Sequence, residues 1–174
     1  MTAPRFAEQL NEQIGNEFAA HQQYVACAIH YDALTMPQMA AFFYAQALEE
    51  RAHAAMMVQY LLDTDAKVVI PAVEAPVNDF ADVVAPVALA LAQEKRVTDQ
   101  VNSLLRIARD EDDFASEQFM QWFIKEQVEE VATMSDLLAV TTRNRDDIAD
   151  IEDYVAREQG RAESDPTAPR QAGA

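Results

Sequence analysis

The sequence predicts an all-α protein: a four-helix bundle with one long crossover between helices two and three and a short fifth helix at the carboxyl end. Only 3 of the 174 residues are glycine, whereas turn-rich all-β proteins need glycine at frequent tight turns. Half of the residues are hydrophobic, which is enough to bury a sizeable core. Apolar side chains recur at helical spacing over long stretches that prolines and polar clusters separate.

The first two helices are predicted over residues 6–34 and 37–63, where the apolar positions follow helical spacing. Gly15 lies inside the first span and costs about 1 kcal/mol relative to alanine. The join at residues 35–38 matches a capping box at Thr35, with a proline in the first turn of the second helix. Because this join is short, we expect the two helices to be antiparallel neighbours.

Residues 64–81 interrupt the helical pattern, because Pro71 and Pro76 forbid a continuous helix. At roughly 3.3 Å per residue, this segment spans about 60 Å when extended. A helix of about 27 residues is only about 40 Å long, at 1.5 Å per residue. The segment can therefore run along the whole bundle and leave helices two and three parallel, which is the single-crossover topology.

The third predicted helix follows the crossover. Asp82 can cap it, and Pro86 is tolerated because amides in the first turn have no acceptor within the helix. An acidic turn at residues 110–113 ends this helix, and a fourth is predicted over residues 114–141. The short turn makes the third and fourth helices antiparallel neighbours as well.

A short fifth helix is predicted over residues 146–158, ended by Gly160. Residues 160–174 contain few hydrophobic side chains, so we expect a disordered tail there. The folded domain is accordingly expected over residues 1–159.

The charge of the chain limits its partners. Its 13 basic and 30 acidic residues give a net charge of -17, which repels nucleic acids and anionic membranes and can attract cations. Cys27 is the single cysteine, so no internal disulfide pair forms and a reducing compartment is expected. No apolar run approaches about 18 residues, and the first residues lack a signal-peptide core, so we expect a cytoplasmic protein.

Acidic side chains interrupt the apolar stripe near the middle of each long predicted helix. The acidic residues are Glu17, Glu50, Glu94 and Glu130. An imidazole, His53, accompanies Glu50, and an amide, Gln127, accompanies Glu130. Burying several ionised carboxylates together would cost many kcal/mol without compensation. A pair of divalent metal ions removes that cost, and oxygen ligands with one imidazole suit iron. A single glutamate on a helix is usually a solvated surface residue, but four at matching depths favour a metal site.

The sequence resembles the bacterial non-haem ferritins and indicates an actinobacterial member of this ferritin-like di-iron family. The resemblance covers roughly residues 6–158 and is closest in NEFAAHQQY (16–24), LEERAHA (48–54) and EQFMQWFIKEQVEEV (117–131). Bacterioferritins would show a second Glu-x-x-His in the fourth helix and a haem-ligating methionine beside the bridging glutamate. Arg51 and Ala52 follow Glu50 here instead, so no haem is expected.

The resemblance implies iron storage with ferroxidase activity, in which dioxygen or hydrogen peroxide oxidises two Fe(II) ions at a di-iron centre within one subunit. The residues that would hold the first iron are Glu17, Glu50 and His53. Glu50 would bridge to a second iron held by Glu94 and Glu130, with Gln127 beside it. The resemblance also implies a hollow shell of 24 subunits.

Four further residues match positions of interest in that family. Glu49, Glu126 and Glu129 correspond to a third iron position, although they could also form a plain charged helix face. Tyr24 corresponds to a tyrosine beside the iron pair, where it could donate a hydrogen bond or an electron, or simply pack in the core.

Two other functions fit parts of the sequence. A soluble di-iron oxygenase or peroxidase of rubrerythrin type would need a second Glu-x-x-His or a cysteine-rich iron module, and the single cysteine excludes that module. A helical assembly protein without catalysis would leave the glutamates solvated. It would bind no stoichiometric iron.

Overall fold

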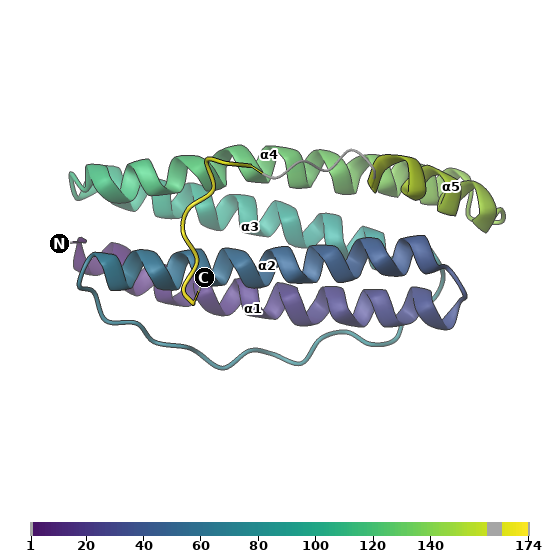
Figure 1. Cartoon of the computed structure of the whole chain (residues 1–174), viewed down its shortest axis with the longest axis horizontal. Helices are drawn as coiled ribbons and strands as arrows, with labels where there is room; N and C mark the ends of the chain where they lie inside the picture. The colour runs from purple at the N-terminus through teal and green to yellow at the C-terminus, as the bar shows by residue number, and fades with distance from the viewer. Residues whose placement is uncertain (1, 160–164, 174) are drawn as a thin grey trace.

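The computed structural model describes residues 2–159 and 165–173, and these residues form five helices and no strand. The helices are α1 (Pro4–Ala33), α2 (Pro37–Asp63), α3 (Ala85–Asp110), α4 (Phe114–Arg143) and α5 (Ile148–Gln159). The first four lie side by side, and α5 lies at the end of the bundle where α1 joins α2 (Figure 1). The predicted all-α bundle with a short fifth helix is confirmed.

The segment between α2 and α3 runs along the full length of the bundle, outside α1 and α2 (Figure 1). Because it carries the chain back to the end at which α2 began, α2 and α3 run in the same direction. This is the predicted single-crossover topology. Within the described part of the chain, no helix is long and apolar enough to cross a membrane.

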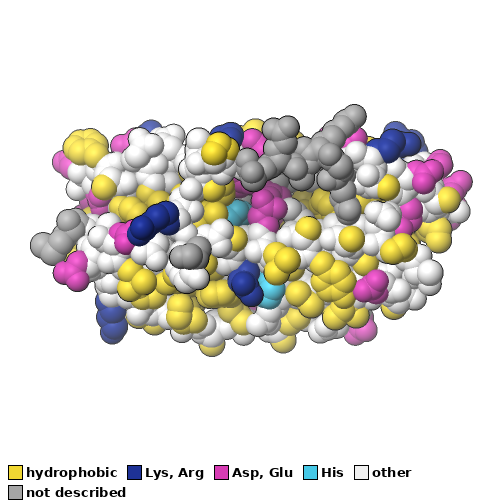
Figure 2. Space-filling view, viewed as in Figure 1, with side chains coloured by type: hydrophobic (Ala, Val, Ile, Leu, Met, Phe, Trp, Pro, Cys, Tyr) yellow, Lys and Arg dark blue, Asp and Glu magenta, His cyan; other side chains and the backbone are white. Residues whose placement is uncertain are grey.

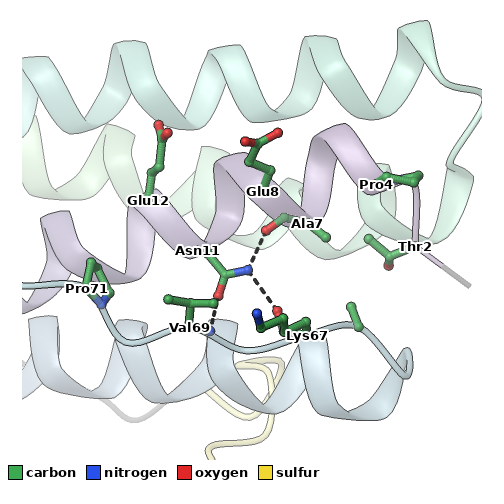
Figure 3. Close-up of a pocket in the computed structure, with 10 residues that line it drawn as sticks. Thr2, Pro4, Ala7, Glu8, Asn11, Glu12, Lys67, Val69 and Pro71 are labelled. Atoms are coloured by element: carbon green, nitrogen blue, oxygen red, sulfur yellow. Dashed lines mark hydrogen bonds between the residues drawn. The ribbon is translucent and has the colours of Figure 1, made fainter.

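Side chains of α1 hold the crossover in place. Asn11 Nδ2 donates to the Lys67 carbonyl oxygen over 2.9 Å, and the Val69 backbone nitrogen donates to Asn11 Oδ1 over 2.6 Å (Figure 3). About three turns further along α1, Gln23 forms the same pair of bonds with the backbone of Val77, over 3.0 and 2.9 Å. The amides of α1 thus supply hydrogen-bond partners to a segment that has no secondary structure of its own.

Gly15 allows the crossover to approach α1 closely. A Cβ atom at this position would lie 2.5 Å from Cγ of Pro71, which is far shorter than an ordinary contact. The proline ring is rigid, so any larger residue would push the two segments apart. This packing explains why a glycine is found inside a helix despite its propensity cost of about 1 kcal/mol.

Two helix starts differ from the sequence expectation. The capping box at Thr35 does not form, because Met36 is the N-cap of α2 without a side-chain cap bond and Thr35 turns the chain with a φ of 60°. Asp82 lies two residues before Val84, the N-cap of α3. Its Oδ1 nevertheless accepts from the backbone nitrogens of Val84 and Ala85, over 2.9 Å each, and so supplies an acceptor at the start of the helix.

The end of the chain crosses the face formed by α4 and α2 (Figure 1). Within residues 165–173, Asp165 Oδ2 accepts from Trp122 Nε1 and from Lys125 Nζ, over 3.1 Å in both cases. One carboxylate of this segment thus has two donors on α4, which the composition of the tail does not reveal, and the disorder expected for the tail stays a prediction. The expectation for residues 160–164 falls outside the described residues.

The apolar core is divided into two clusters along the bundle. The cluster near the α1–α2 join includes Tyr31 and Phe43, and the cluster near the opposite end includes Phe6 and Leu104. On each of the four long helices, a short polar stretch separates residues of the first cluster from residues of the second. The middle of the bundle is therefore a polar region enclosed between two apolar ones.

Candidate metal centre

Six polar side chains occupy this middle region. They are Glu17 from α1, Glu50 and His53 from α2, Glu94 from α3, and Gln127 and Glu130 from α4. Each of the six residues is between 0 and 6 % exposed. Each lies at helical spacing from buried apolar residues of its own helix, so the packing that buries the apolar stripe buries these residues as well.

Three of the six form a compact group at the contact between α1 and α2. His53 Nδ1 lies 3.5 Å from Glu50 Oε2 and 3.9 Å from Glu17 Oε2. One ligand atom from each residue lies within 4.8 Å of the other two. Two carboxylates and an imidazole at this spacing can bind one divalent metal ion together.

Glu94 is held by hydrogen bonds from two neighbouring helices. The Tyr24 hydroxyl donates to Glu94 Oε1, and Gln127 Nε2 donates to Oε2 over 3.4 Å. Burial, followed by the charge of Glu94, raises the pKa of Tyr24 well above its ordinary value, so the phenol stays neutral and remains a donor. Among the described residues, neither Glu94 nor Glu130 belongs to a group of three potential ligands whose ligand atoms all lie within 4.8 Å of one another.

Three carboxylate oxygens in this region have no hydrogen-bond partner within the described part of the chain: Glu17 Oε2, Glu50 Oε2 and Glu130 Oε2. A buried acceptor without a partner is costly, and buried polar atoms in proteins are nearly always satisfied. In each of these three residues, only one of the two carboxylate oxygens is buried without a partner. Cations bound between these carboxylates would supply the missing partners, so the donor set fits metal ions.

Burial raises the pKa of every glutamate in the region. Desolvation is the largest cause in each case, and the charges of neighbouring carboxylates add to it. The pKa of Glu94 rises to about 6, and the pKa values of Glu17, Glu50 and Glu130 rise well above 4.5. Without a cation, ionising this cluster at neutral pH therefore opposes folding.

The raised pKa of Glu94 predicts how the stability of the metal-free protein depends on pH. The folded state holds the Glu94 proton more tightly than the unfolded state, whose pKa is near 4.5. The resulting stability is fully present below that pH and is lost as the pH rises through about 6. In Glu94→Gln, we expect the decrease in unfolding free energy between pH 5 and pH 7.5 to be smaller than in the wild type by about 1 kcal/mol, because part of the effect is already lost between pH 4.5 and pH 5. Denaturant unfolding of the wild type and Glu94→Gln at both pH values measures these free energies. Equal decreases in the two proteins would contradict the prediction.

A second group of carboxylates lies next to the first. Glu49, His53 and Glu126 each offer a ligand atom within 4.8 Å of the others. A hollow of about 780 Å³ between α2, α4 and α5 is lined in part by Glu49, Glu126, Glu129 and Glu130. Glu129 is exposed, with Oε1 3.9 Å from Lys125 Nζ, and lies outside the tight group. Figure 2 shows acidic side chains beside a histidine near the middle of this face.

The structure adds three residues that the sequence prediction did not include. Gln13 Nε2 donates to Glu17 over 2.8 Å, Gln46 Nε2 donates to Glu49 over 2.8 Å, and Thr98 Oγ1 donates to Gln127 over 3.0 Å. One signal for the glutamines is present in the sequence. Gln13 and Gln46 stand four residues before Glu17 and Glu50, which places each on the same helix face as a predicted ligand.

Comparison with known proteins shows which family the chain is similar to. Residues 7–144 match the family description "Ferritin-like domain". The chain is 52% identical over 169 residues to Ferritin BfrB of Mycolicibacterium smegmatis, covering 97% of this chain and 93% of the relative. It is 36% identical over 147 residues to the bacterial non-heme ferritin of Staphylococcus aureus, covering 84% and 89%. Among solved structures, an open pore ferritin from the archaeon Archaeoglobus fulgidus superposes with a TM-score of 0.88 at 26% identity, covering 93% of this chain and 100% of that chain.

Proposed function

The chain belongs to the ferritin family, and from that premise we propose that it is an iron-storage protein that oxidises Fe(II) to Fe(III) at a di-iron centre in each subunit. One observation carries the proposal. Carboxylate oxygens of Glu17, Glu50 and Glu130 are buried in the middle of the bundle with no hydrogen-bond partner among the described residues. A bound cation can satisfy several such oxygens at once.

Each ligand has a separate part in the proposed reaction. Glu17, Glu50 and His53 bind the first Fe(II), and Glu50 also reaches the second, which Glu94 and Glu130 bind. Each Fe(II) gives one electron, so the pair reduces dioxygen and two protons to hydrogen peroxide, or hydrogen peroxide to two hydroxide ions. Carboxylates favour this oxidation because their negative charge stabilises Fe(III) more than Fe(II).

Hydrogen bonds from neighbouring residues orient a ligand of the proposed second iron position. Tyr24 and Gln127 both donate to Glu94, so this carboxylate keeps its orientation while iron enters and leaves. Glu49, Glu126 and Glu129 lie at the adjacent hollow. In the proposal they form a third iron position and take up iron that leaves the pair.

We include assembly and location in the same proposal. Twenty-four copies form a hollow shell in the cytoplasm, and ferric mineral collects inside it. No haem takes part, because Arg51 and Ala52 follow Glu50 where a haem ligand would be needed. No nucleic acid or membrane takes part either, since the net charge of -17 repels both.

Aerobic addition of Fe(II) tests this function. Absorbance of Fe(III) is expected to appear much faster than in a protein-free control, and the ferric iron is expected to elute with the protein on size exclusion. Native mass measurement is expected to give 24 copies of the 19.4 kDa chain, or about 466 kDa. A stable monomer or 12-mer, or oxidation at the rate of the control, would contradict the proposal.

A further inference from the structure

We propose that Gln13 is a positioning residue for the metal centre: it fixes the orientation of Glu17, so that one oxygen of this carboxylate faces the ligands of α2. This inference rests on the proposed function. It concerns a residue that binds no metal itself and acts through the ligand beside it.

The amide of Gln13 is held in one orientation. Gln13 is only 1 % exposed. Its Nε2 donates to Glu17 Oε1 over 2.8 Å and to Gln100 Oε1 over 3.3 Å, and its Oε1 accepts from Asn16 Nδ2 over 3.1 Å. Both amide hydrogens and the carbonyl oxygen are therefore used. Turning the amide over would point its oxygen at the acceptor oxygens of Glu17 and Gln100.

This fixed amide determines which way Glu17 faces. The bond from Gln13 occupies Oε1, whereas Oε2 is buried without a hydrogen-bond partner in the described part of the chain. The free oxygen lies 3.9 Å from His53 Nδ1, on the side of the α2 ligands. Rotating the carboxylate away from α2 would break the bond to Gln13, so the ligand oxygen is directed before any metal arrives.

The same amide connects two of the helices that build the centre. α1 and α3 supply one glutamate each, Glu17 and Glu94, and the bond from Gln13 to Gln100 joins these two helices. A positioning role explains both the burial of the amide and its complete hydrogen bonding.

Cobalt(II) titration of the assembled protein tests the role of Gln13 without relying on iron oxidation. Gln13→Met keeps the length and volume of the side chain and removes the bond to Glu17. We expect about tenfold weaker binding of the first cobalt, the lower end of the effect of losing a group that orients a ligand, together with altered cobalt absorption bands. Gln93→Met is the matched control, because Gln93 is also buried and its Nε2 has no partner among the described residues. It should bind cobalt as the wild type does.

Three outcomes would overturn the inference while leaving the proposed function intact. In the first, Gln13→Met binds cobalt with wild-type affinity and spectrum. In the second, Gln93→Met loses as much cobalt affinity as Gln13→Met does. In the third, Asn16→Ala leaves the cobalt affinity unchanged. The last variant removes the donor that holds the Gln13 carbonyl, and alanine is well tolerated in a helix, so it remains decisive if Gln13→Met does not fold. We expect Asn16→Ala to bind cobalt about threefold more weakly than the wild type, a smaller loss than in Gln13→Met because the bond from Gln13 to Glu17 can still form. A wild-type protein that binds no cobalt at all would instead contradict the proposed function itself.

Discussion

Glu130→Ala is expected to slow the aerobic oxidation of Fe(II) by about a hundredfold, the upper end of the effect of losing even a group that supports a ligand. Glu130 is 6 % exposed and has a buried oxygen without a partner among the described residues. Alanine removes that oxygen, so the second iron of the proposed pair loses one of its three carboxylates and no longer stays beside the first. Absorbance of Fe(III) after mixing Fe(II) with the protein in air measures the rate.

Glu12→Ala is the matched control for this experiment. It removes a glutamate from an exposed position on α1, so the chain loses the same charge while the centre is unchanged. We expect its oxidation rate to equal that of the wild type. Equal rates in the wild type and Glu130→Ala would show that oxidation does not depend on the buried carboxylates.

Glu50→Gln is expected to increase the unfolding free energy of the metal-free protein at pH 7.5 by about 1–4 kcal/mol, by analogy with the gain found when buried ion pairs are replaced by hydrophobic residues of similar volume. Burial and the charges of Glu94 and Glu130 raise the pKa of Glu50 well above its ordinary value, so its ionisation opposes folding at this pH. Glutamine keeps the shape of the side chain and removes the charge. Chemical denaturation of both proteins in the presence of a chelator measures the difference.

The same substitution should reduce the stabilisation that a bound metal provides. Cobalt(II) stabilises the folded state by binding to it, and Glu50→Gln lacks the carboxylate expected to bridge the pair. Glu12→Gln is the control, with a change within about 0.5 kcal/mol as expected at an exposed position. A decrease in the metal-free stability of Glu50→Gln would contradict the interpretation, because it would mean that the Glu50 carboxylate stabilises the fold.

The sequence predicted the fold because its signals are local and repeat along the chain. Helical spacing, the prolines in residues 64–81 and the near absence of glycine are enough to define the helices and the crossover. The helix start that was wrong depends on a single dihedral angle, because Thr35 forms a turn with positive φ instead of a cap. The contacts of Asp165 could not be predicted from local patterns, because its partners on α4 lie 40 or more residues away in the chain.

The candidate site could be predicted in part for the same reason. An acidic residue within an apolar stripe is visible in the sequence, and the structure buries Glu17, Glu50, Glu94 and Glu130. Their role as ligands stays a prediction. The hydrogen bonds of Gln13 could not be predicted, because they depend on how side chains of α1 and α3 meet after the helices pack.

Diffraction from crystals soaked with ferrous salt without oxygen is the most direct test of the central claim, namely that iron ions compensate the charge buried in the bundle. The account predicts two anomalous peaks at the iron absorption edge, one among Glu17, Glu50 and His53 and one beside Glu94 and Glu130. A map without iron between these side chains, or with their carboxylates turned toward bulk water, would contradict it.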